Sequence, residues 1–339
     1  WKIVAWGRGL LLLDVVNKRV YQIDKNTGAL KRTLARKGTG PGEFQLIIDI
    51  APTLSGGFVA LDCLRNSVTE YNQSGQVVKV YRLAYEHRAP ESIAQATSGY
   101  YIVSANRNLE DGSTMRKYQF LPYPKSTFLN IYTGEFQLRN SFSSPRKEFW
   151  KTEGIFDRPC MGSFSPFVIS GDTVISMLQN GCYEIRLHDI AGNQLGTLQV
   201  QSEFFQEFSA KTLADFRFLG EGNSKKPSLN DEEIGRAISS HSFPTALVLN
   251  QGVLVIKIVE PFDNYFPQYQ KDLERNVHYD VFSYAGGSLK PLRTGLRTDL
   301  ELLGSNKSGE WYFWRREKSE PPARLCTLLV ARTKSSLGK

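Results

Sequence analysis

The sequence predicts an all-β fold, a six-bladed β-propeller, and three observations support this prediction. Aromatic residues make up 12% of the chain, with 20 Phe and 15 Tyr, and flat side chains are favoured in strands. Short polar turns with a glycine recur along the chain, each flanked by alternating apolar residues, which is the pattern of a β-hairpin. These turns contain Gly28, Gly75, Gly134, Gly192 and Gly287. Each repeat holds about four short strands, as a propeller blade does.

The first two repeats show their strands most clearly. Apolar or alternating runs separated by turn residues make up the first repeat: 2–6, 9–16, 19–24 and 30–35. The second begins with the run 46–52 and continues with three more strands over 56–83. Asp24 and Asp62 end two of these strands, where a carboxylate is expected to accept hydrogen bonds from turn amides. The pattern leaves open whether residues 1–6 complete the first blade or close the ring by joining the last.

The later repeats are less regular, and one of them contains an insertion. The interval between the last two glycine turns is too long for one blade, and residues 201–240 within it have a different composition. Acidic residues follow Asn230, as at the start of a helix, so we expect a helical insertion between blades four and five. A sixth blade is expected over residues 300–333. All blades belong to one predicted domain, residues 1–339.

The glycine-rich run 37–44, KGTGPGEF, raises the question of whether it holds a phosphate or only turns the chain. A phosphate-binding loop needs a helix after its glycines and usually a Lys that follows them. Here an apolar, strand-like run follows the glycines, and the Lys precedes them. Glycine tolerates positive φ and proline fixes φ, as a tight crossing between two blades requires. We therefore predict a structural turn built from Gly38, Gly40, Pro41, Gly42 and Glu43.

Residues 21–44 and 56–83 carry a resemblance to a known family. They are similar to the six-bladed β-propeller proteins of the Bacteroidetes lipoprotein type, which are distantly similar to NHL-repeat propellers. The most specific mark is the segment G-x-G-P-G-E-[FY], here residues 38–44. The resemblance is sequence-specific over residues 1–85 and architectural beyond them. It implies a propeller exported to the periplasm or cell surface as an outer-membrane lipoprotein, and it implies no defined activity. The long insertion and the lack of a lipid-anchoring Cys at the start depart from the family pattern.

Composition and charge narrow the classes of partner. The net charge is +8, with 42 basic and 34 acidic residues spread along the chain, so we expect an acidic partner and no nucleic acid. No apolar run reaches the length of a membrane-spanning helix. The chain opens directly in a strand, so we expect a longer precursor and membrane association through a lipid anchor absent from this chain. The cysteines lack metal-ligand spacing; Cys160 and Cys182 could bridge neighbouring strands or stay as buried thiols.

The sequence offers one candidate ligand or metal site. His87 and His241 lie in segments that connect blades, which often reach the mouth of a propeller channel. With Asp49 and Glu91 they would supply ligands for Ca²⁺ or Zn²⁺ if the chain were a metal-dependent lactonase or lyase. Lone histidines are more often surface or core residues, and no G-x-S-x-G motif occurs. Outside this alternative no cofactor is expected.

These observations favour a non-catalytic function. We expect an exported scaffold that binds an envelope or secretion-related protein, because insertions on rigid scaffolds commonly carry function. The expected partner-contacting segments are 201–240 and 261–276, with four aromatic candidates: Phe204, Phe205, Tyr265 and Tyr269. The alternatives are a glycan-binding surface protein and a metal-dependent lactonase or lyase, since propellers host both enzymes and binding proteins.

Overall fold

A computed structural model of the chain describes most of its strands and tight turns. The described residues are 2–40, 42–84, 88–107, 126–143, 164–178, 183–200, 202, 243–259, 277–298, 300–306, 309–316 and 326–332. Every regular element within these ranges is a strand, which confirms the all-β prediction. The same ranges contain no helix with the length and apolar character needed to cross a membrane.

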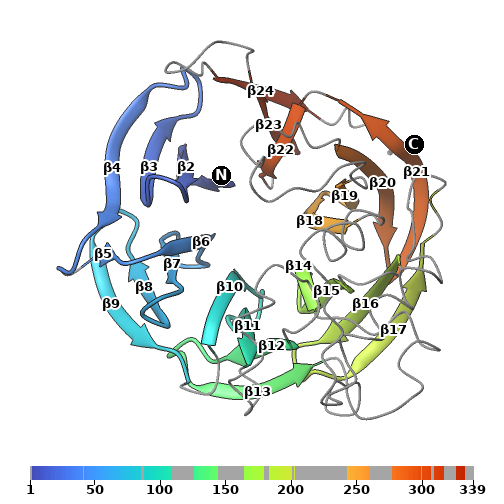
Figure 1. Cartoon of the computed structure of the whole chain (residues 1–339), viewed down its shortest axis with the longest axis horizontal. Coiled ribbons are helices and arrows are strands. Elements are labelled where there is room, and N and C mark those ends of the chain that lie inside the picture. The colour runs from blue at the N-terminus through green and yellow to red at the C-terminus, as the bar shows by residue number, and fades with distance from the viewer. Residues whose placement is uncertain are drawn as a thin grey trace, which may run out of the picture.

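The described strands form six sheets that follow one another along the chain (Figure 1). Sheet 1 consists of β1 (Lys2–Trp6), β2 (Gly9–Asp14), β3 (Arg19–Asp24), β4 (Leu30–Lys37) and β5 (Glu43–Phe44). Sheet 2 consists of β6 (Ile47–Pro52), β7 (Phe58–Asp62), β8 (Ser67–Tyr71) and β9 (Val77–Arg82). Sheet 3 consists of β10 (Arg88–Gln95), β11 (Tyr101–Arg107), β12 (Ser126–Tyr132) and β13 (Leu138–Ser143).

The second half of the chain continues in the same way. Sheet 4 consists of β14 (Phe164–Ser170), β15 (Thr173–Leu178), β16 (Glu184–Asp189) and β17 (Gln194–Gln199). Sheet 5 consists of β18 (Phe243–Asn250), β19 (Val253–Val259), β20 (Val277–Ala285) and β21 (Ser288–Arg297). Sheet 6 consists of β22 (Leu300–Ser305), β23 (Glu310–Arg316) and β24 (Cys326–Arg332).

Strand order within each sheet follows the chain, and all pairs are antiparallel except β4 with β5. The first strand of each sheet lies nearest the centre of the ring and the last lies at its periphery (Figure 1). Sheets 2 to 5 thus have the four strands of a complete blade, sheet 1 has four and the short β5 in addition, and sheet 6 has three in the part that the structure describes. The prediction of six blades is corrected to five complete blades and this smaller sheet.

Contacts between innermost strands close the ring. Each innermost strand touches the next, and β22 of sheet 6 touches β1 of sheet 1. β1 itself pairs with β2, from Lys2 opposite Leu13 to Trp6 opposite Gly9, so it completes sheet 1. At the closing contact a Cβ on Gly304 would lie 2.1 Å from the carbonyl oxygen of Ile3. The ring therefore closes through close backbone packing of β22 on β1.

Apolar side chains between neighbouring sheets form the core. Between sheets 1 and 2, Phe58 stacks on Tyr71 with ring centroids 4.3 Å apart, and Trp6 meets Phe58 edge-on at 5.5 Å. All five residues of β7 are buried, as expected for a strand with sheets packed on both faces. The core is therefore a series of layers between sheets, and the two ends and the outer edge of the ring remain for function.

The antiparallel order gives the two ends of the ring different connections. Connections from first to second strand and from third to fourth strand share one end, and none exceeds five residues. We call this end the turn face. Second-to-third and sheet-to-sheet connections share the opposite end, which we call the loop face. Every segment longer than ten residues starts and finishes there: 108–125, 144–163, 200–242 and 260–276.

The predicted helical insertion falls in residues 201–240, of which only Ser202 belongs to the described residues. No helix is present in the described part of the chain. Cys160 and Cys182, with the question of a bridge between them, also lie outside the described residues.

Candidate functional site

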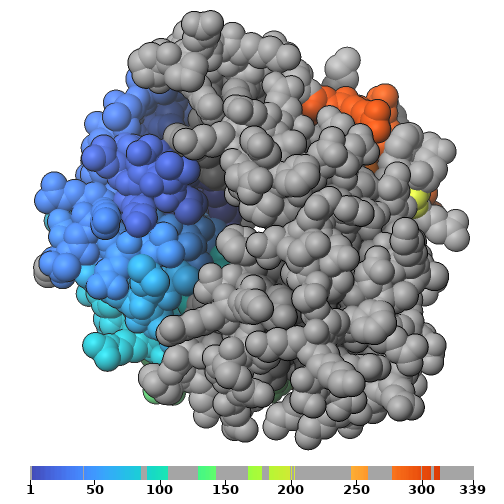
Figure 2. Space-filling view, viewed as in Figure 1, coloured from blue at the N-terminus to red at the C-terminus, as the bar shows by residue number. Residues whose placement is uncertain are grey.

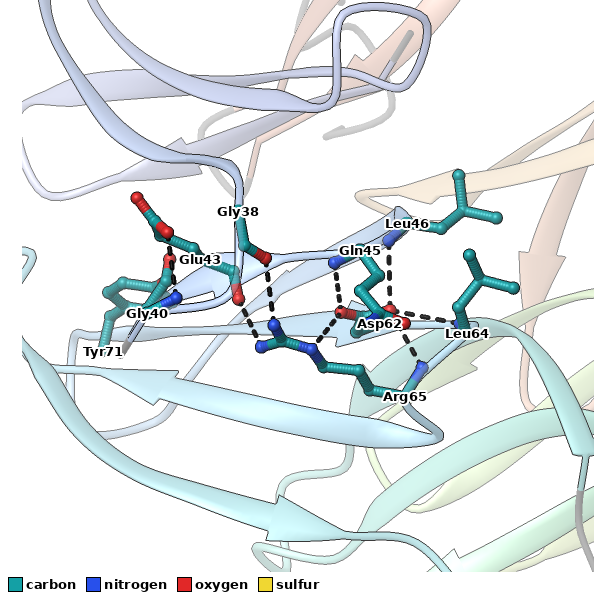
Figure 3. A network of polar contacts seen from close by, with 10 residues as sticks. Gly38, Gly40, Glu43, Gln45, Leu46, Asp62, Leu64, Arg65 and Tyr71 are labelled. Atoms are coloured by element: carbon teal, nitrogen blue, oxygen red, sulfur yellow. Dashed lines mark hydrogen bonds and ion pairs between the residues drawn. The ribbon is translucent and has the colours of Figure 1, made fainter.

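The glycine-rich run forms the crossing from sheet 1 to sheet 2 (Figure 3). The Gly38 amide donates to the carbonyl of Phe44 at 3.0 Å, and the Glu43 amide donates to the carbonyl of Gly40 at 3.0 Å. The Gly40 amide donates to Glu43 Oε2 at 2.9 Å. The carboxylate of Glu43 thus takes the hydrogen bond that an anion would accept in a phosphate-binding loop.

The glycines of this loop are required by space and by backbone conformation. A Cβ on Gly38 would lie 2.0 Å from Glu43 Oε2. Gly42 has φ +74°, and a Cβ there would also lie 2.6 Å from Cγ2 of Val77. The Gly40 amide and then the guanidinium of Arg36 hold the pKa of Glu43 below its usual value. The loop is closed by its own charged carboxylate, which fits the predicted turn; Pro41 lies outside the described residues.

Arg65 and Asp62 of sheet 2 fasten this loop (Figure 3). The guanidinium of Arg65 donates from Nη1 to the Glu43 carbonyl at 2.8 Å and from Nη2 to the Gly38 carbonyl at 2.9 Å. The buried carboxylate of Asp62 accepts four backbone amides, at 2.8 to 3.2 Å, from Gln45, Leu46, Leu64 and Arg65. Asp62 therefore acts as expected from its place at a strand end. Arg65 was not indicated by any sequence signal.

Asp49, a member of the candidate ligand site, joins three innermost strands. Its Oδ1 accepts the ammonium of Lys2 in β1 at 2.6 Å and the Ile50 amide of β6 at 2.8 Å. Its Oδ2 accepts the Ile93 amide of β10 at 2.8 Å. The side chain keeps 5% of its surface exposed. Both oxygens are thus engaged in bonds between sheets 1, 2 and 3.

The other members of the predicted sites are not brought together in the described residues. Glu91 is half-buried in β10. Lying outside the described residues are His87, His241, Phe204, Phe205, Tyr265 and Tyr269. Within the described ranges, no group of three His, Cys, Asp or Glu side chains could hold a metal ion. The metal site stays a prediction, and the bonds of Asp49 give that residue a structural role.

A buried polar network fastens sheet 6 to sheet 1, and sequence reasoning missed it. The Glu310 carboxylate accepts the Lys25 ammonium at 2.7 Å, the Asn306 amide at 2.6 Å and the Tyr312 hydroxyl at 3.1 Å. The Lys25 ammonium and then the Asn306 and Tyr312 bonds lower the pKa of Glu310 to about 2. Asn250 of sheet 5 donates to the Glu310 carbonyl at 3.3 Å. Three sheets therefore meet at one carboxylate-bearing residue.

Polar contacts also join the remaining sheets. Between sheets 4 and 5 the buried Tyr183 hydroxyl donates to Asp280 Oδ2 at 2.7 Å, and burial raises the pKa of Tyr183 far above its usual value. Between sheets 3 and 4 the Thr97 hydroxyl donates to Asp172 at 2.9 Å. Between sheets 2 and 3 the Leu54 amide donates to a neighbouring glutamine side chain at 2.7 Å. Each pair of neighbouring sheets is thus fixed by directional bonds as well as by apolar packing.

Two of the histidines are core residues. His188 in β16 and His278 in β20 are 4% and 0% exposed. The ring of His188 lies 4.8 Å from that of Phe142. Burial, together with the nearby charge of Arg186, lowers the pKa of His188 to about 4. This side chain is therefore neutral near pH 7.

Solved structures resemble this ring at low sequence identity. A protein of Bacteroides fragilis, provisionally named as exported, matches with a TM-score of 0.61 and 12% identity, covering 98% of this chain and 90% of its own. The fold is a β-propeller. A DUF4221 member from Bacteroides vulgatus matches this propeller with a TM-score of 0.57 and 9% identity, covering 98% of this chain and 92% of its own. A gluconolactonase of Xanthomonas campestris reaches a TM-score of only 0.49 at 13% identity, covering 96% of this chain and 82% of its own.

At these identities the likenesses show the propeller fold alone. No family model matches the sequence, and a search of curated proteins finds no significant relative.

Proposed function

We propose that this propeller is a non-catalytic scaffold, exported to the bacterial envelope, that binds a protein partner at its loop face. The observation that carries the proposal is the unequal length of the connections at the two ends. The turn face has only connections of five residues or fewer, and the long segments all connect strand ends at the loop face. Long segments on a rigid scaffold are the usual place for recognition.

One of these segments is not required for strand pairing. β19 ends at Val259 and β20 begins at Val277, and these two residues are directly opposite each other in the sheet. A two-residue turn is enough to join antiparallel neighbours. The intervening residues 260–276 therefore exceed what the fold needs, and they contain the candidate contacts Tyr265 and Tyr269. Residues 201–240, with Phe204 and Phe205, join sheets 4 and 5 at the same face.

The use made of Asp49 favours a scaffold over a channel metal site. A metal ligand must present a carboxylate oxygen to the ion, whereas both oxygens of Asp49 are bonded to Lys2 and to two backbone amides. The metal-dependent lactonase or lyase, with Ca²⁺ or Zn²⁺ held by His87, His241 and Glu91, remains the alternative that the experiment below must address.

The envelope location and the family-level details belong to the same proposal. Support for export comes from the Bacteroides fragilis neighbour, which is itself provisionally named as exported, and from the family resemblance of residues 38–44. We propose that the ring is NHL-like, with sheet 6 as a smaller element between sheets 5 and 1. We also propose that the mature protein is an outer-membrane lipoprotein.

The proposal is tested by affinity capture from native envelope, with metal content measured on the same purified sample. Two variants accompany the wild-type protein: one in which Gly-Ser replaces residues 260–276, and Asp49→Asn. We expect the shortened variant to keep its thermal stability and to lose a stoichiometric protein that the wild type captures. We expect Asp49→Asn to lower stability by about 1–3 kcal/mol with metal content unchanged. Stoichiometric metal that disappears in Asp49→Asn would overturn the scaffold reading.

A further inference from the structure

Four strands at the outer edge of the ring carry charge of one sign. β4, β9, β13 and β21 together contain ten basic residues and no Asp or Glu, although acids form 34 of the 339 residues of the chain. The outer strand of sheet 4, β17, is uncharged, and the short β5 beside β4 contributes Glu43. We call these ten side chains the basic rim: Lys31, Arg32, Arg36, Lys37, Lys79, Arg82, Arg139, Lys290, Arg293 and Arg297. The strands that carry them lie at the periphery of the ring (Figure 1).

Much of this charge is not neutralised within the described residues. Three members form ion pairs with acids of β3, of β5 and of one turn: Lys31 with Asp24, Arg36 with Glu43 and Lys79 with Glu135. Arg32 donates to the neutral groups of Gln22 and Ser74, and Arg139 lies on the ring of Tyr100. Lys37, Arg82, Lys290 and Arg293 are exposed, and in the described part of the chain none forms an ion pair. The rim therefore keeps a net positive charge.

An irregularity in β21 brings two of these cations onto one face. Lys290 lies opposite Ser283 of β20, and Arg293 lies opposite Val281, with a register shift between them near Leu292. Ser283 and Val281 are two positions apart on β20, so their partners point to the same side of the sheet, about 7 Å apart along the strand. In a regular strand, residues three positions apart would point to opposite sides. The bulge thus builds a pair of neighbouring, exposed cations.

Protection of sheet edges explains charge on outer strands but not its single sign. Exposed edges pair with other chains unless they are blunted, and charged side chains, Lys above all, are one means of doing so. Glu would protect an edge as well, and mixed signs would also avoid the self-repulsion of a uniformly charged band. The basic outer strands of sheets 1, 2, 3 and 5 instead provide an attractive field for an anion along these parts of the outer edge.

The surroundings of the rim favour one class of anion. Bases of nucleic acids need aromatic platforms, and the only outer-strand aromatics with described side chains, Tyr81 and Phe142, pack on Phe136 and His188. The core of a protein interface is depleted in charged residues. The basic rim is rich in them, so it does not resemble the core of a protein interface. A flat membrane would meet only part of the edge of a ring (Figure 1), and Figure 2 shows the exposed surface of sheets 1 and 2 at the left of the molecule.

We propose that the basic rim binds a polyanionic polysaccharide through its carboxylate or sulfate groups. A flexible chain with repeated negative charges can follow the successive outer strands of sheets 1 to 3, and the cation pair of Lys290 and Arg293 provides a separate anchor on sheet 5. This site lies on the outer strands and is independent of the protein partner proposed for the loop face. The contacts are exposed and electrostatic, so binding weakens steeply as salt screens them.

The test compares two double variants that change net charge equally. Lys290→Glu with Arg293→Glu alters the rim, and Arg8→Glu with Arg19→Glu alters exposed residues outside it. Calorimetric titration measures the affinity of each protein for heparin and for polygalacturonate, at low and at physiological salt. Dextran is the neutral control polymer, and poly-L-glutamate is the acidic polypeptide control. Thermal unfolding verifies that each variant is folded.

We expect at least one acidic polysaccharide to bind the wild type more tightly at low salt, and dextran not to bind. The rim variant should lose about tenfold or more in affinity, and the matched control less than about twofold. Equal losses in both variants would show that only net charge matters and would overturn the proposal. Absence of binding by either polysaccharide, or tighter binding of poly-L-glutamate, would also overturn it. None of these outcomes bears on capture of the loop-face partner. The substitutions Lys290→Glu and Arg293→Glu lie on an outer strand, so we expect them to leave that capture unchanged.

Discussion

Replacing Glu310 by Gln is expected to loosen the closing contact of the ring. Glu310 is 3% exposed and its carboxylate accepts bonds from Lys25, Asn306 and Tyr312. Gln keeps the shape of the side chain and one acceptor oxygen, but it loses the negative charge. The Lys25 ammonium would then face a neutral amide at the junction of sheets 6 and 1. This substitution therefore isolates the electrostatic part of the junction.

The pKa of Glu310 sets the expected magnitude. A pKa lowered from 4.5 to about 2 corresponds to roughly 3 kcal/mol in favour of the charged form. Lys25 keeps 32% of its side-chain surface exposed, and solvent screening weakens such a pair. We therefore expect Glu310→Gln to lower the free energy of unfolding by about 1.5–2 kcal/mol near pH 7.

The pH dependence gives the sharper test. The folded state holds the pKa of Glu310 below that of the unfolded chain, so the unfolded chain binds more protons between pH 4.5 and about 2. The contribution of Glu310 is thus complete above pH 4.5 and is lost as pH falls toward 2. Other carboxyl groups titrate equally in both proteins. The stability difference between wild type and Glu310→Gln should therefore shrink to near zero across this window.

Urea unfolding followed by tryptophan fluorescence measures this difference at several pH values. The matched control is Glu135→Gln, whose partner is Lys79 and whose side chain is 70% exposed; it should change stability by less than about 0.5 kcal/mol. A double-mutant cycle with Lys25→Met assigns the effect to the ion pair. A loss at Glu310 no larger than at Glu135, or a difference that stays constant between pH 5 and 2, would refute the reasoning.

Three further changes probe the fold. Gly304→Ala places a Cβ against a backbone carbonyl of β1 and should lower the free energy of unfolding by about 2–4 kcal/mol. In the same thermal melts the control Gly196→Ala, whose Cβ would meet nothing within 4 Å, should be nearly neutral. Tyr183→Phe removes a donor to the buried Asp280 and should cost about 1–3 kcal/mol; an unchanged urea midpoint would contradict this. The pKa of His188 is lowered to about 4, so wild-type stability should fall as pH drops from about 6.5 to 4, and His188→Gln should flatten that slope.

The part of the fold that sequence predicts well is the part set by local chemistry. The turn from Asp24 to Gly28 is an example, because the Asp24 carboxylate accepts the amides of Asn26 and Thr27 and Gly28 takes φ +71°. Similar turns recur at Asn72 and Asp189, so the strands between them could be placed in order and grouped into blades. The number of blades was overestimated at six, since the described part of sheet 6 has only three strands.

Contacts between distant segments explain what sequence reasoning missed. Asp49 stands alone in an apolar run and suggested a ligand, because nothing local reveals that the amide of Ile93 lies against it. Lys25 and Glu310 are near opposite ends of the chain, and only ring closure brings them together. Even the side of the sheet to which Arg293 points depends on a bulge that the local sequence pattern does not indicate. Local patterns thus predict elements, while the roles of polar side chains depend on which sheets become neighbours.

The topology also explains why the two proposed binding regions lie where they do. Sheet faces are buried against neighbouring sheets, as the fully buried β7 shows, so they cannot accept new side chains without loss of packing. At the turn face, short hairpins fix the register of the strands they join, and added residues would disturb it. The loop face and the outer strands are free of both constraints. Long segments and additional charge can therefore be accommodated in these two regions without a change in the core of the propeller, which is why both binding proposals are placed there.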